Sequence, residues 1–136
     1  MCLQEVLTKE EFEEKFGPVS EYGYKVMMSS GPHGFISCVQ GSLEAMPIGR
    51  TVHKEDYSED VPPFKLGYEV GFHIWARRKT GIMMAQRLTG ICLCLVKVKI
   101  GEINAYGIEF NYLDNKPMEV VVCETMTIME EVNVPK

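Results

Sequence analysis

The residues best suited to chemistry lie in one segment, GYEVGFHIWARRKTGIMMAQRLTG, which spans residues 67–90. It contains the single tryptophan of the chain, Trp75, two residues after His73. Arg77 and Arg78 follow Trp75 after one alanine. An indole can stack on a planar ring, an imidazole can hydrogen-bond to that ring, and a guanidinium binds anions. These residue types are therefore suited to a face that can hold a planar ligand, with an anion bound nearby.

A strand is predicted over residues 68–76, and its alternation decides which side chains share a face. Successive side chains of a strand point to opposite faces, so Phe72 and Ile74 lie on one face and His73 and Trp75 on the other. The first face belongs to the core. The second face is either a binding wall for a ligand or a structural surface, in which Trp75 covers a sheet edge and His73 makes satisfied hydrogen bonds.

A local group of cations follows this strand in a chain of net charge −5. Its members are Arg77, Arg78, Lys79 and Arg87. Binding along DNA normally needs a net or local basic surplus, so the acidic balance predicts no general DNA binding. A localised site for an anion, such as the phosphates of a nucleotide, fits Arg77, Arg78 and Arg87.

Other reactive residues form no recognisable site in the sequence. The histidines and the five cysteines show no pair at zinc-ligand spacing, so we expect no metal site. Cys2 would resemble an N-terminal nucleophile if Met1 were removed, but no Gly-rich oxyanion loop follows it. P-loop, dinucleotide-binding, G-x-S-x-G and H-E-x-x-H motifs are absent from the sequence. We interpret Cys2 as an ordinary thiol near the terminus.

Length and composition predict one globular domain over residues 1–136. The chain is 46% apolar and 24% charged, as in ordinary soluble proteins. No apolar run approaches the roughly 20 residues that cross a bilayer, and the acidic N-terminal segment lacks a signal-peptide core. The odd number of cysteines gives no disulfide framework. We therefore expect a reduced, cytoplasmic protein without membrane contact.

The elements that position these residues follow from local patterns. Thr8 and Glu11 form a capping box, and Phe12 and Phe16 mark the apolar edge of a short helix that ends at Gly17. The rest of the chain is expected to contain a hairpin over residues 22–40, a loop over 41–65, a helix over 80–88, and strands over 91–100 and 118–132. The predicted fold is a single compact α+β domain, a mostly antiparallel twisted sheet with a short N-terminal helix and one central helix.

The order of several short motifs carries a resemblance. They are the strand segment YKV, then GFHIW, a helix with a central alanine, LVKVKI, a Tyr-Gly pair and MEVVVCETMTI. This pattern, from residue 22 to residue 129, resembles small, largely uncharacterised proteins of bacteria and phages that begin Met-Cys-Leu and share a Gly-Phe-His segment. The resemblance implies an accessory protein of a phage or mobile element.

More distantly, the same order resembles the ADP-ribosyltransferase fold. In that fold a first strand offers Arg or His to NAD, a Gly-x-Tyr-x-Thr segment precedes a helix, and a late strand carries a catalytic Glu. The resemblance places Lys25 at the first position, His73 on the Tyr and Trp75 on the Thr, and Glu119 on the catalytic Glu, with Glu124 as a weaker candidate. It thus implies a possible site for NAD or another nucleotide.

Two hypotheses follow. The first is a non-catalytic accessory protein that binds a host defence protein or sequesters a nucleotide-like small molecule. An acidic protein of this kind can complement a basic channel. Its ligand-binding residues would be Lys25, His73, Trp75, Arg77, Arg78 and Arg87. The alternative is an ADP-ribosyltransferase-like enzyme that acts on an NAD-type substrate with Glu119, His73 and Lys25. The replacement of the usual Tyr by His73 favours the first.

Overall fold

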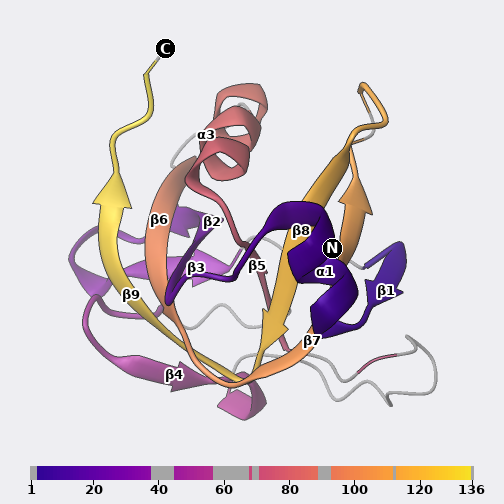
Figure 1. Ribbon diagram of the computed structural model, residues 1–136. Helices are drawn as coiled ribbons and strands as arrows, with labels where there is room; N and C mark the ends of the chain where they lie inside the picture. Colours follow the sequence, from indigo (N-terminus) through magenta and orange to yellow (C-terminus); the bar gives the residue numbers. More distant parts are fainter. Residues whose placement is uncertain are drawn as a thin grey trace.

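The computed structural model describes residues 3–37, 45–56, 68, 71–88, 93–111 and 113–135. These residues form a single α+β domain with two helices and a nine-stranded, curled antiparallel sheet that makes a half-barrel (Figure 1). The predicted fold class is therefore confirmed. The helices are α1 (Lys9–Phe16) and α3 (Arg78–Arg87).

The strands lie in the order β1-β7-β8-β5-β2-β6-β9-β4, and β3 pairs with β2 beside this path. Their bounds are β1 Glu5–Leu7, β2 Tyr22–Ser29, β3 Phe35–Ser37, β4 Thr51–His53, β5 Phe72–Trp75, β6 Leu93–Ile100, β7 Ile103–Phe110, β8 Pro117–Cys123 and β9 Thr125–Val132. Two short 3-10 turns cover Gly31–His33 and Lys54–Asp56. The hairpin expected over 22–40 is present as β2 and β3, as far as its residues are described.

A bent two-stranded ribbon organises the sheet. β6 and β7 pair along the ribbon with β9 and β8, and the ribbon bends where Gly101 and Glu102 meet Glu124 and Thr125. The Gly101 N–H donates to the Thr125 carbonyl (3.0 Å), and the Glu124 N–H donates to the Glu102 carbonyl (2.8 Å). One half of the ribbon lies beside β2 and the other lies between β1 and β5. This bend curls the sheet.

Two expectations about single elements are corrected. The predicted final strand over 118–132 is interrupted at Glu124, because the ribbon changes direction there and continues in another part of the sheet. The segment expected as a loop over 41–65 contains β4, which pairs with β9 from Thr51↔Thr127 to His53↔Thr125. Residues 41–44 and 57–65 of that segment lie outside the described residues.

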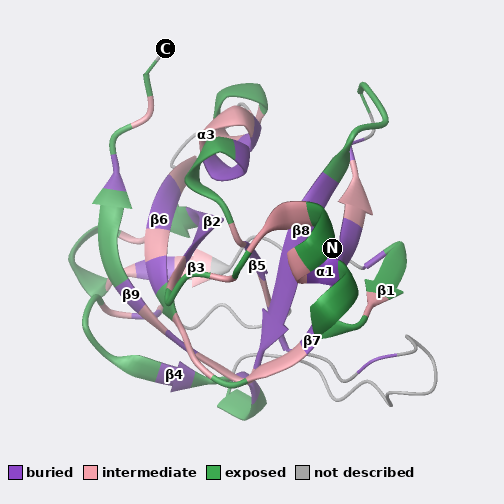
Figure 2. Cartoon of the chain, viewed as in Figure 1, coloured by how far each residue is buried: buried purple, intermediate pink, exposed green. Residues whose placement is uncertain are grey.

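Each face of the sheet carries its own apolar core (Figure 2). The α1-side core contains Phe12 of α1 together with Phe72 and Ile74 of β5. The α3-side core contains Met84 of α3 together with Trp75 of β5. Because both faces are covered, β5 and β8 are buried on both sides and contain few positions open to solvent.

Helix α1 begins and ends as its sequence predicts. The Glu11 N–H donates to Thr8 Oγ1 (3.1 Å), and the Thr8 N–H donates to Glu11 Oε1 (3.0 Å), so the capping box is complete. Phe12 is buried, and its ring contacts the rings of Phe16 and Tyr106. These contacts dock α1 on its side of the sheet.

Candidate functional site

The alternation predicted for β5 is present. Phe72 and Ile74 enter the α1-side core, whereas Trp75 enters the α3-side core with His73 on the same face. In the register with β8, His73 pairs with Val122 and Trp75 with Val120. The exposure of Trp75 and His73 decides whether this second face can bind a ligand or is a buried structural surface.

Trp75 lies inside the α3-side core. Only 3% of its surface is exposed, and it shares this core with Tyr24, Met84 and Val120. Its Nε1 is buried and has no hydrogen-bond partner among the described residues. The indole therefore presents no open face on which a planar ligand could stack.

His73 takes part in a chain of hydrogen bonds with a single consistent direction. Its Nδ1 lies 3.2 Å from the Gly71 carbonyl oxygen, which can only accept, so Nδ1 carries the proton. Its Nε2, 2.9 Å from Tyr68 Oη, then accepts from the phenol, and Tyr68 Oη accepts the Leu3 N–H at 3.2 Å. The chain runs from Leu3 through Tyr68 and His73 to Gly71 and joins three separate segments.

Burial keeps His73 neutral. The pKa of His73 is lowered from 6.5 to about 4, mainly by desolvation and also by the nearby positive charge of Lys25. Neutral imidazole has one donor and one acceptor, as the chain of hydrogen bonds requires. Since both nitrogens already have partners, His73 is held by the structure in one tautomer and one orientation.

Lys25 and Tyr68 contact His73, and the sequence did not indicate Tyr68. The ammonium of Lys25, which is 5% exposed, donates to the His73 carbonyl oxygen at 3.0 Å. Tyr68 is buried and contacts the His73 ring edge-on. Burial raises the pKa of Glu109, and the positive charge of Lys25 opposes that rise. No spacing in the sequence links Tyr68 to His73 in a recognisable motif, so local patterns contain no signal for this contact.

Glu119 is paired with Arg77 on the other face of the sheet. Its carboxylate is fully buried, and Oε2 accepts from Arg77 Nη2 at 2.8 Å. This hydrogen bond raises the pKa of Arg77. The Arg77 guanidinium also lies over the Phe16 ring of α1, 5.4 Å from its centroid. Glu119 Oε1 is buried without a hydrogen-bond partner among the described residues.

The predicted site residues are thus divided between two places. The structure brings Lys25 to the backbone of His73 and brings Arg77 to Glu119. It does not bring Glu119 to His73, because Glu119 shares the face of Val121 and His73 shares the face of Val122. The set Glu119, His73 and Lys25 therefore does not converge on one point from one side of the sheet.

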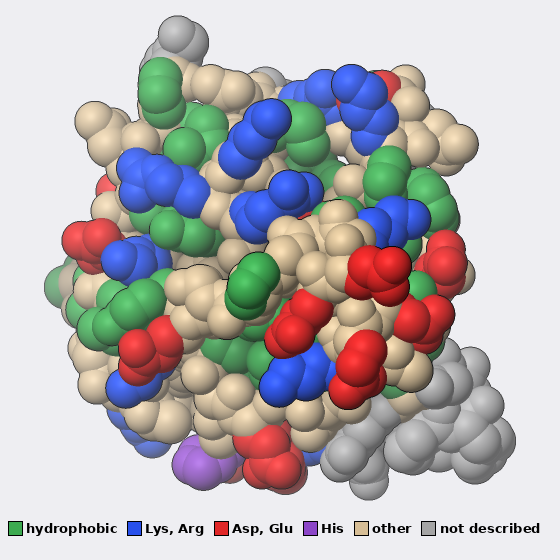
Figure 3. Space-filling model, in the orientation of Figure 1, with side chains coloured by type: hydrophobic (Ala, Val, Ile, Leu, Met, Phe, Trp, Pro, Cys, Tyr) green, Lys and Arg blue, Asp and Glu red, His purple; other side chains and the backbone are tan. Residues whose placement is uncertain are grey.

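The other cations of the predicted site lie on the surface. Four exposed cations lie on α3 or next to it, and we call them the α3 basic face. They are Arg78 and Lys79 in the first turn of α3, Arg87 in its last turn, and Lys116 between β7 and β8. Arg87 Nη2 lies 3.3 Å from Asp114 Oδ2, whereas no ion pair joins Arg78, Lys79 or Lys116 to a carboxylate within the described ranges. Figure 3 shows Lys and Arg side chains gathered over α3 and Asp and Glu side chains over α1.

Neither a metal centre nor a membrane-crossing helix is found where the structure is described. No group of three or more His, Cys, Asp or Glu side chains is placed to hold a metal ion among these residues. Of the helices described, none has the length and apolar character needed to cross a bilayer. Burial raises the pKa of the Cys123 thiol to about 11, which disfavours the reactive thiolate. Cys2 lies outside the described residues.

The fold and the site define an α+β half-barrel protein with two covered faces and a basic helix on its surface. Comparisons with family models, curated proteins and solved structures find no match to the chain. What the protein does must therefore be inferred from its own residues.

Proposed function

We propose that this protein is a non-catalytic accessory protein that binds an acidic partner protein through the α3 basic face. The observation that carries the proposal is the exposure of Arg78 and Lys79 without carboxylate partners among the described residues, on a chain of net charge −5. Complementary charge raises the rate of association and selects the partner. The resemblance to small phage and bacterial proteins supports an accessory role.

The position of these cations in α3 supports a role outside the fold. A helix N-terminus carries a partial positive charge, so basic residues in the first turn are unfavourable for the helix. Helix α3 has Arg78 and Lys79 there, no acidic residue, and no side-chain cap from Arg77. Helix α1, in contrast, has a complete capping box and two acidic residues in its first turn. The charges of Arg78 and Lys79 do not serve helix stability, which supports a role in recognition.

Because Trp75 is buried, a protein fits as the ligand of this chain better than a nucleotide does. Sequestration of a nucleotide-like molecule would use an exposed ring for stacking. Trp75 is 3% exposed and His73 already has partners on both ring nitrogens. Side-chain carboxylates of a protein need no stacking partner and fit exposed Arg and Lys side chains.

The catalytic alternative, an ADP-ribosyltransferase-like enzyme, would need Glu119 beside the reacting sugar. Glu119 is fully buried, bonded to Arg77, and on the opposite face from the His73 ring. We therefore expect no release of nicotinamide from NAD by the purified protein. Release that is abolished by Glu119→Gln would overturn the non-catalytic part of the proposal.

Binding is tested with a defined acidic polypeptide. Fluorescently labelled poly-glutamate is titrated with the wild-type protein, with Arg78→Glu/Lys79→Glu, and with Lys9→Glu/Lys15→Glu in α1 as the control of equal charge change. We expect the α3 variant to lose about tenfold in affinity at low ionic strength and the α1 variant less than twofold. Equal losses in both variants would show that net charge alone drives binding and would contradict the proposal.

A further inference from the structure

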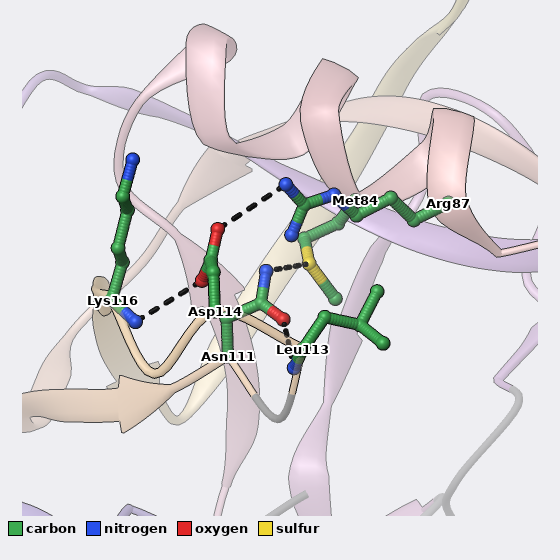
Figure 4. Close-up of polar contacts among 6 residues, drawn as sticks. All are labelled: Met84, Arg87, Asn111, Leu113, Asp114 and Lys116. Atoms are coloured by element: carbon green, nitrogen blue, oxygen red, sulfur yellow. Dashed lines mark hydrogen bonds and ion pairs between the residues drawn. The ribbon is translucent and has the colours of Figure 1, made fainter.

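The turn that joins β7 to β8 carries an exposed apolar residue beside the α3 basic face. Leu113 in this turn is 61% exposed. Figure 4 shows Leu113 and Lys116 extending from opposite sides of the turn, with the contact between Arg87 and Asp114 between them. The surface around this turn therefore offers an apolar side chain as well as charged groups.

Hydrogen bonds within the turn fix its shape. The Asn111 N–H donates to the Lys116 carbonyl (3.0 Å), and the Asn115 N–H donates to the Asn111 carbonyl (2.7 Å). The Leu113 N–H donates to Asn111 Oδ1 (2.9 Å), and the Lys116 N–H donates to Asp114 Oδ1 (3.1 Å). Asn115 adopts a φ of 55°, which asparagine tolerates better than most residues. These hydrogen bonds connect Leu113 and Lys116 to neighbouring described residues of the turn.

Two contacts fasten the turn to α3. Asn111, which is 1% exposed, points its Nδ2 at Met84 Sδ (3.7 Å), and Arg87 donates to Asp114 (Figure 4). The Lys116 N–H lowers the pKa of Asp114, and the Arg87 guanidinium lowers it further. These contacts place the turn beside Met84 and Arg87 of α3.

We infer that Leu113 and the α3 basic face form one docking surface for an acidic protein segment that carries an apolar side chain. This inference rests on the proposed function and adds the class of partner and the residue at the centre of contact. The carboxylates of the segment would pair with Arg78, Lys79 and Lys116, and its apolar side chain would cover Leu113.

Other occupants fit this surface less well. A phosphodiester backbone would satisfy the cations and leave Leu113 uncovered. A second copy of the chain could offer the acidic face of α1, but a head-to-tail contact of this kind continues into open chains unless its rotation closes a ring. An acidic segment with an apolar residue uses both the charge and the apolar part of the surface.

The test uses two labelled acidic peptides of equal charge, one with leucine at positions i and i+4 and one with serine there. An oligo-dT strand serves as a nucleic-acid probe. Fluorescence anisotropy compares the wild-type chain with Leu113→Ser and with Ile48→Ser, a matched control at a residue that is 55% exposed. We expect the wild-type chain to prefer the leucine peptide, Leu113→Ser to weaken that binding about tenfold, and Ile48→Ser to change it less than twofold.

The outcomes separate this inference from the function on which it rests. If Arg78→Glu/Lys79→Glu weakens peptide binding but Leu113→Ser does not, the role of Leu113 is wrong and the proposed function stands. If neither change matters, both are wrong. Tighter binding of oligo-dT than of either peptide would assign the surface to nucleic acid. Self-association in light scattering that Leu113→Ser removes would assign it to a second copy, and each of these two results overturns the inference.

Discussion

The two faces of the sheet contain different kinds of buried polar group, an ion pair on one and a neutral chain of hydrogen bonds on the other. On the α1 side, the fully buried carboxylate of Glu119 is paired with Arg77. On the α3 side, Tyr68 and His73 form a neutral chain of hydrogen bonds. A neutral hydrogen-bonded group costs less to remove from water than an ion does. The ion pair accordingly lies where Arg77 keeps 49% of its side chain exposed.

This difference shows what the residue types most suggestive of chemistry do here. His73, Trp75 and Glu119 make internal contacts that account for their burial. Arg78 and Lys79 make no comparable contact within the described residues, so their charges are open to a partner. The part of the segment 67–90 that favours recognition is therefore its helix, while its strand belongs to the core.

The largest effect is expected for Trp75→Ala. Removing a fully buried aromatic side chain lowers the free energy of unfolding by about 3–5 kcal/mol, since Trp75 is 3% exposed in the α3-side core. Urea unfolding followed by far-UV circular dichroism measures the change, because the single tryptophan is lost as a fluorescence probe. A loss below about 1 kcal/mol would contradict the assignment of Trp75 to the core.

The neutral chain on the α3 side predicts acid sensitivity. The pKa of His73 is about 4 in the folded protein against 6.5 unfolded, so between these values the unfolded chain binds more protons. Stability should therefore fall as pH decreases from about 6.5 to about 4, by a total on the order of 3 kcal/mol. Chemical unfolding at several pH values measures this slope.

A variant without the titrating ring isolates the contribution of His73. His73→Gln should remove most of the slope over this pH range, whereas His53→Gln, at an exposed position of β4, should retain it. The pKa of Glu109 is raised by burial, which gives a contribution of opposite sign. If His73→Gln keeps the full slope, the neutral chain is not its source.

Removal of Arg77 tests the α1 side. Arg77→Ala leaves the buried Glu119 carboxylate without its partner and also removes the contact with Phe16. Breaking a buried ion pair costs about 3–5 kcal/mol, and the half-exposed position of Arg77 reduces the expected loss to about 2 kcal/mol. Arg78→Ala, on the exposed face of α3, should change stability by less than about 0.5 kcal/mol. Thermal unfolding compares the two, and equal effects would argue against a structural role for the pair.

Local patterns were sufficient where neighbours in sequence decide the structure. Thr8 and Glu11 predicted the start of α1, and the alternation of Phe72 to Trp75 predicted their faces. Both depend on geometry within a few residues, a helical turn or the pleat of a strand. The fold class followed from the same patterns.

Distant contacts decided what the sequence did not predict. Trp75 is buried because α3 covers its face, and the final strand is interrupted because Glu124 meets Glu102 across the ribbon. The pairing of Glu119 with Arg77 joins residues 42 positions apart. Tyr68 becomes a partner of His73 only through the folded chain. No periodicity within one segment contains this information.

A smaller effect concerns how closely α3 approaches the sheet. A Cβ added at Gly81 would lie 2.7 Å from Tyr24 Cβ and 3.2 Å from Leu95 Cδ1. Alanine gains about 1 kcal/mol in helix propensity, but overpacking costs about 1–3 kcal/mol, so Gly81→Ala should lower the free energy of unfolding by about 1 kcal/mol. Lys79→Ala, at an exposed position of the same helix, is the control and should be neutral in chemical unfolding. A stabilised Gly81→Ala variant would mean that α3 can move away from β2, and the close packing of the α3 side would then be wrong.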